Sequence, residues 1–181
     1  SDKRLLAKEH TMEIGVLVEA PLPKIIDYAE RIIDAAISLS GNASNPDKCG
    51  GYLAVWTVYL NNVPGSLELL ARLGYTPEEK LAKRMEVAME KCQRLDSGDG
   101  MGHLTSYESR NPEIGRWGGG VRGPQHIYAF SGLPELWDEA AMLVLAIRLC
   151  QLDDDDVLAL ISEERNPHLR PLLEACNWII E

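Results

Sequence analysis

The sequence predicts an all-α protein, a helical bundle of seven to eight helices interrupted by one long, ordered insertion rich in glycine. Apolar residues recur at spacings of three and four along several segments, as in helices that bury one face. Helix-capping residues flank these segments, and we find no convincing strand. The 181 residues, 45% of them hydrophobic, suffice for one core. We therefore expect a single helical domain over residues 1–181, with the insertion at 96–133.

Two helices are expected in the first part of the chain. The first spans residues 2–19, with Gly15 as its one helix breaker. The second follows Pro23, and Gly41 stands where a left-handed cap would end it. Its apolar residues keep helical spacing over four turns: Ile25, Ile26, Ala29, Ile32, Ile33, Ala36 and Ile37.

Residues 52–60 form an unbroken apolar run, which fits a buried strand as well as a buried helix. We interpret it as a helix, because Asn45 and Pro46 supply starting signals and no partner strand is evident. A short helix is expected at 66–73. A further helix opens at the capping box of Thr76 to Glu79 and runs to about residue 95.

The character of the chain changes between residues 96 and 133, where nine of the fifteen glycines lie. A connection of about forty residues is long for a compact domain, and ordered connections of this kind usually carry function. Its apolar and aromatic residues indicate that it is ordered. Three more helices are expected after it, starting near Pro134, Val157 and Pro167.

Charge and cysteine content exclude several classes of protein. Eighteen Lys and Arg against 28 Asp and Glu give a net charge of −10, which disfavours nucleic acid as a partner. No apolar run approaches the roughly 20 residues that span a bilayer, so we expect no membrane partner. The four cysteines form no Cys-x-x-Cys pair, which argues against structural zinc and favours a reducing, cytoplasmic location.

The insertion holds the candidate ligand site. All three of its cations are arginines, which suit paired hydrogen bonds to carboxylate or phosphate, and its glycines allow backbone N–H groups to approach an anion. The alternative is that these arginines form salt bridges with the surrounding acidic helices. The predicted ligand-binding residues are Arg110, Arg116, Trp117, Arg122, His126, Tyr128 and Ser131.

A second candidate site follows the insertion. Glu135, Asp138 and Glu139 are spaced by three and four residues, which places three carboxylates on one helix face. Crowded carboxylates can bind Mg²⁺ or Mn²⁺. Acidic residues in a first helical turn are also favoured by the helix dipole alone, and the acidic run at 153–156 is most simply an N-cap cluster.

These observations favour a binding or interaction module that uses the Gly/Arg-rich segment 96–133 to bind a protein partner or a small anionic ligand. Two alternatives remain. One is a metal-dependent hydrolase of a phosphate-containing substrate, and the other is a structural domain that forms a homo-oligomer. No motif in the sequence decides whether the protein is an enzyme.

Overall fold

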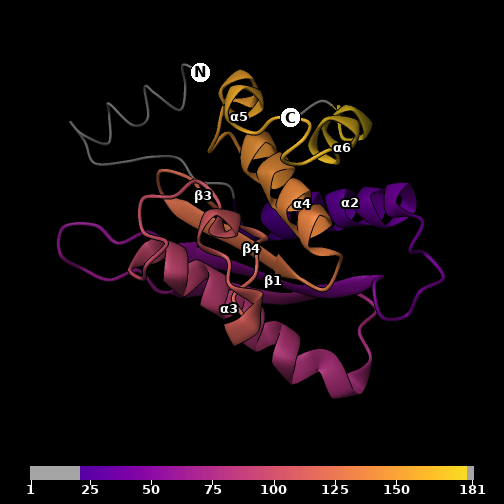
Figure 1. Ribbon diagram of the computed structural model, residues 1–181, viewed down its shortest axis with the longest axis horizontal. Coiled ribbons are helices and arrows are strands. Elements are labelled where there is room, and N and C mark those ends of the chain that lie inside the picture. The colour runs from indigo at the N-terminus through magenta and orange to yellow at the C-terminus, as the bar shows by residue number, and fades with distance from the viewer. Residues whose placement is uncertain (1–20, 179–181) are drawn as a thin grey trace.

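The computed structural model describes residues 21–178, which form a mixed α/β fold (Figure 1). A four-stranded antiparallel sheet of order β2-β1-β4-β3 lies between helices. The prediction of an all-α bundle is therefore wrong, and the described residues contain five α-helices rather than seven or eight. The elements are α2 (Leu22–Ser40), β1 (Gly50–Thr57), β2 (Leu67–Gly74), α3 (Leu81–Asp96), β3 (Gly120–Arg122), β4 (His126–Ser131), α4 (Glu135–Arg148), α5 (Asp154–Leu160) and α6 (Leu169–Ala175).

The strands β1 and β2 replace the two helices expected at 52–60 and 66–73. They form an antiparallel hairpin in which Gly50 pairs with Gly74. β1 also pairs with β4, in a register that places Tyr52 opposite Ser131. The apolar run at 52–60 thus has the strand partners that seemed to be missing, because one follows in the next segment and the other comes from the glycine-rich region.

The expected insertion at 96–133 is not a connection alone. Its second half supplies β3 and β4, and its first half contains two short 3-10 turns, at Ser106–Ser109 and Pro112–Ile114. All six residues of β4 are buried. A strand covered on both faces has no apolar and polar alternation, so its sequence lacks the usual strand signal.

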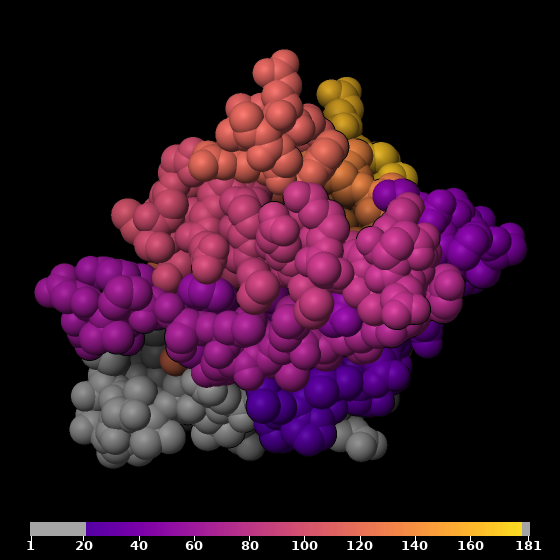
Figure 2. All heavy atoms as spheres, turned by 90° about the horizontal axis from the view of Figure 1, so that it is seen from below, coloured from indigo at the N-terminus to yellow at the C-terminus, as the bar shows by residue number. Residues whose placement is uncertain are grey.

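Helices cover both faces of the sheet. On one face α2 and α4 pack with α6, and their core includes Ile33, Phe130 and Leu143. On the other face, α3 is the one helix of residues 21–178 that packs on the sheet, with Ala88 and Cys92 against alternate residues of β1 and β4. Figure 2 views this second face, where α3 crosses the centre between the β1–β2 hairpin and the residues that follow α3.

Two capping predictions are confirmed. Gly41 ends α2 with a φ of 72°, as a left-handed cap does. The Asp153 side chain caps α5 by accepting a hydrogen bond from the Asp156 N–H.

All four cysteines are free. Within residues 21–178, no helix combines the length and apolar character that crossing a membrane requires. The helix expected at 2–19 lies outside the described residues.

Candidate functional site

A cleft of about 250 Å³ lies between α3, the end of β4 and the first turn of α4. We call it the Lys91 cleft. α3 contributes Lys83, Arg84, Val87 and Lys91 to its wall, and Lys48 comes from the segment before β1. The remaining lining residues come from the glycine-rich segment and the start of α4: Trp117, Ser131, Gly132, Leu133, Glu135 and Asp138.

Lys91 and Asp138 form a buried ion pair in the wall of this cleft. The Nζ of Lys91 lies 3.5 Å from Oδ2 of Asp138, and the two side chains are 1% and 5% exposed. The same Nζ donates a hydrogen bond of 2.6 Å to the carbonyl of Phe130, at the end of β4. The other oxygen of Asp138, Oδ1, accepts a hydrogen bond of 2.9 Å from the Leu133 N–H. Each charge therefore has a counter-charge and a backbone partner.

Burial perturbs both members of the pair. It lowers the pKa of the Lys91 ammonium, against the opposing effect of the nearby Asp138 carboxylate. It raises the pKa of Asp138 to about 6, although Lys91 and the backbone N–H groups favour the ionised form. Perturbed groups of this kind in a cleft are typical of functional sites.

Two further cations stand beside the pair. Arg84 is 8% exposed and donates hydrogen bonds to the carbonyls of Gly50 and Asp47, at 3.1 and 2.5 Å, so it fixes the chain before β1. Lys48, in that same segment, is half-buried, and its ammonium makes no hydrogen bond or ion pair with residues 21–178. Its charge acts on Asp138 across the cleft. Lys48 therefore offers a cation that no described carboxylate neutralises by contact.

Arg110 and the backbone of the glycine-rich segment bind an anion that belongs to the protein itself, the carboxylate of Glu135. Arg110 donates hydrogen bonds of 2.8 and 2.6 Å to the two carboxylate oxygens of Glu135, and the Gly118 N–H donates another of 2.6 Å. Burial disfavours the ionised carboxyl, but these donors outweigh it and lower the pKa of Glu135. The anion held by Arg110 and the glycine backbone is thus a carboxylate of the chain itself.

The other predicted ligand residues lie in different places. Arg116 pairs with Asp99, and Arg122 donates to the carbonyl of Leu95 at 2.7 Å, so the three arginines do not converge on one point. His126 lies 3.2 Å from Glu68, and Tyr128 is buried in the core. Of the predicted set, two line the Lys91 cleft: Trp117 and Ser131.

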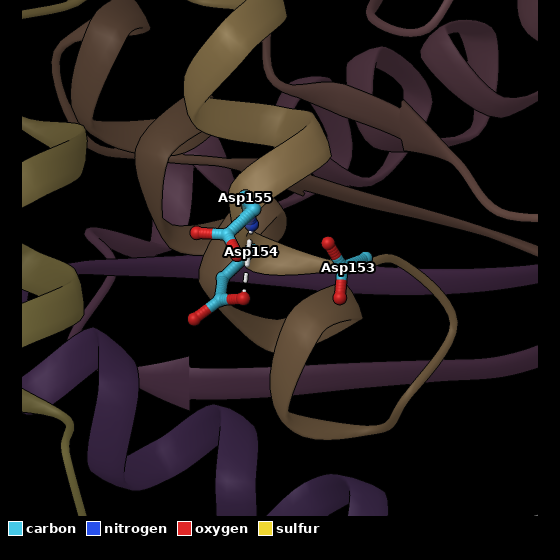
Figure 3. A group of neighbouring side chains, drawn as sticks. All are labelled: Asp153, Asp154 and Asp155. Atoms are coloured by element: carbon cyan, nitrogen blue, oxygen red, sulfur yellow. Dashed lines mark hydrogen bonds between the residues drawn. The ribbon is translucent and has the colours of Figure 1, made fainter. Parts of the chain in front are cut away.

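The three predicted metal ligands each have a different cationic partner. Glu135 binds Arg110, Asp138 faces Lys91, and Glu139 forms a two-fold hydrogen-bonded pair with Arg165. The structure does not bring these three carboxylates together around one point. In residues 21–178, the one group with suitable oxygen spacing for a metal is Asp153 to Asp155, which are exposed at the start of α5 (Figure 3). Its capping role explains that cluster.

Sequence reasoning missed the cations of the Lys91 cleft, since they lie outside the glycine-rich segment. One signal was available: Lys91 follows Ala88 by three residues and precedes Leu95 by four, so it lies on the apolar face of its helix. A lysine in that position must be buried with a counter-charge or reach solvent past its neighbours.

The chain matches no protein-family model, and no curated protein and no solved structure is significantly similar to it. The class of protein is therefore defined by the fold and the site alone. It is an α/β protein with an antiparallel sheet and a cationic cleft at one end of that sheet.

Proposed function

We propose that the protein binds a small anionic ligand in the Lys91 cleft. The observation that carries the proposal is the charge of this cleft. Four cationic side chains line it against two carboxylates, in a chain whose net charge is −10. One of those carboxylates, Glu135, is already neutralised by Arg110. A local excess of cations in an acidic protein attracts anions to that place.

The cleft also limits the size and character of the ligand. Its volume of about 250 Å³ lies just below the range of about 300–1,000 Å³ that is typical of drug-sized ligands, so the ligand must be small. Val87, Leu133 and Trp117 supply apolar wall, and the Ser131 hydroxyl supplies a polar group. A small organic acid fits this combination better than a protein segment. The glycine-rich segment contributes to the site through Trp117, as one wall rather than as the whole of it.

The geometry favours this function over metal-dependent hydrolysis. A metal site needs carboxylate oxygens directed at one ion. Glu135, Asp138 and Glu139 instead have Arg110, Lys91 and Arg165 as partners. These contacts occupy the carboxylates with protein cations.

The proposal is tested by titrating the protein with small anions and following amide chemical shifts. Inorganic phosphate, acetate and pyruvate are the probes. We expect saturable shifts at residues of the cleft, with binding at least tenfold weaker in Lys48→Glu. The control is Arg170→Glu, which makes the same charge change at an exposed residue of α6, outside the cleft. If no probe shifts the cleft residues, or if both variants bind as the wild type does, the proposal is wrong.

A further inference from the structure

We propose that Lys91 is a nucleophilic amine that forms a reversible imine with the carbonyl group of a small 2-oxo acid bound in the Lys91 cleft. This inference rests on the proposed function and specifies its ligand. It assigns to the buried pair a chemical role in addition to its charge.

The position of Lys91 makes its ammonium easier to deprotonate than that of an exposed lysine. Its side chain is 1% exposed, and a Cβ built at Gly119 would lie 2.7 Å from Nζ, so the glycine backbone closes over this atom. Burial on this scale disfavours the charged form and lowers the pKa of Lys91. Only the neutral amine has the lone pair that attacks a carbonyl carbon.

Asp138 is placed to exchange the proton. Its Oδ1 is held by the Leu133 N–H, which leaves Oδ2 as the oxygen that faces Nζ of Lys91. Burial raises the pKa of Asp138 to about 6, so the carboxyl can both take and return a proton near neutral pH. The Asp138 side chain is 5% exposed, which keeps bulk water from replacing it in this role.

The reaction balances without another reactant. Asp138 takes a proton from the ammonium, and the amine lone pair forms a C–N bond as the carbonyl C–O π bond breaks. A second proton then passes from the nitrogen to the oxygen, which gives a neutral carbinolamine. The C–O bond then breaks and the hydroxyl leaves as water with the proton returned by Asp138. In sum, the ammonium and the ketone give a protonated imine and one water. The positive charge stays on the lysine nitrogen, beside the Asp138 carboxylate.

A 2-oxo acid matches the arrangement of charges in the cleft. Its 2-oxo group reacts with Lys91, and its carboxylate pairs with the ammonium of Lys48. Lys48 makes no ion pair with the described residues. The third lysine of the cleft, Lys83, differs from Lys91. Its side chain is 68% exposed and lies 3.4 Å from Glu86, so it has neither the burial nor a buried acid.

The test is reductive trapping. The wild-type protein is incubated with pyruvate or glyoxylate and borohydride, which reduces an imine to a stable secondary amine, and the modified residue is located by peptide mass spectrometry. We expect modification at Lys91 well above that at Lys48 and Lys83. Peptide mapping of the wild type is sufficient in itself, so the test does not depend on a variant that folds poorly.

Two variants test whether imine formation depends on Asp138 and not on an exposed lysine. We expect Lys80→Arg, at a lysine 42% exposed and outside the cleft, to trap as the wild type does. We expect Asp138→Asn to trap at least tenfold more slowly while it still binds pyruvate. Trapping spread evenly over the exposed lysines overturns the inference. So does pyruvate binding in the cleft without an adduct at Lys91 from either probe, although anion binding then stands. Failure of every probe to bind overturns the proposed function as well.

Discussion

Lys91 and Asp138 meet at 3.5 Å although the helices that carry them, α3 and α4, pack on opposite faces of the sheet. They come together beyond the end of β4, where Nζ also binds the carbonyl of Phe130. The pair therefore links both helical layers to the central strand. It is a structural contact and, in the function proposed here, part of the ligand site.

Removal of Lys91 leaves a buried carboxylate without its counter-charge. We expect Lys91→Met to lower the free energy of unfolding by about 3–5 kcal/mol at pH 8, as for other broken buried ion pairs. We expect Lys91→Met to lose less unfolding free energy at pH 5 than at pH 8. The pKa of Asp138, already about 6, rises further without the lysine. A carboxyl whose folded pKa exceeds its unfolded pKa stabilises the fold while protonated and loses that contribution as the pH rises. Urea unfolding at both pH values measures the difference.

The matched control is the double variant with Asp138→Asn. Asparagine keeps an acceptor for the Leu133 N–H and carries no charge to compensate. We expect it to recover part of the lost stability at pH 8 and to remove the dependence on pH. An equal penalty for Lys91→Met at pH 5 and pH 8 would show that Asp138 is not the group responsible.

The contribution of Glu135 to the stability of the fold changes with pH in the opposite direction to that of Asp138. Burial opposes its ionisation, but the donors on Arg110 and Gly118 prevail and lower its pKa. A lowered carboxyl pKa contributes stability above the unfolded value, and that contribution is lost as the pH falls through the folded value. Glu135→Gln should therefore cost about 2 kcal/mol at pH 7, as for hydrogen bonds to a charged group. The deficit should narrow below about pH 4, because the carboxyl of the unfolded chain takes up a proton there while the folded protein still holds Glu135 ionised.

Thermal unfolding at pH 7 and in acid measures this effect. Glu113→Gln is the control, because Glu113 is exposed in the same segment of the chain and forms no ion pair within the described residues. It should unfold as the wild type does at each pH. A Glu135→Gln deficit that stays constant into acid would rule out the carboxylate as the source of the stability.

The sequence predicted helices well and strands poorly, for a physical reason. The helices α2 and α3 show their buried face within one segment, through apolar residues three and four apart. The strand β1 is an apolar run whose meaning depends on its partners. One of those partners, β4, lies about seventy residues further along the chain. Because β4 is buried on both faces, its own residues show no alternating pattern that predicts a strand.

The candidate site could also be predicted only in part from the sequence, because its residues come from distant segments. Trp117, Ser131, Glu135 and Asp138 are sequence-predicted residues that line the cleft, and their roles toward a ligand remain predictions. The lysines of the cleft were missed because sequence reasoning sought one cluster of cations, whereas the fold assembles them from two segments. Arginine and glycine were expected to bind an external anion. In residues 21–178 the anion that Arg110 and Gly118 bind is Glu135, a contact that no spacing rule predicts.

Gly119 is needed for a close approach as well as for its backbone angle. Its φ is 112°, and an added Cβ would lie 2.7 Å from both the Asp138 Cβ and the Lys91 Nζ. Gly102 has a similar φ of 93° with no atom within 4 Å, so Gly102→Ala measures the backbone cost alone. We expect about 1–2 kcal/mol for Gly102→Ala. Gly119→Ala should cost about 1–3 kcal/mol more, because its methyl group overpacks the pair. Urea unfolding of both variants tests this, and equal costs would show that the glycine does not pack against Lys91 as described.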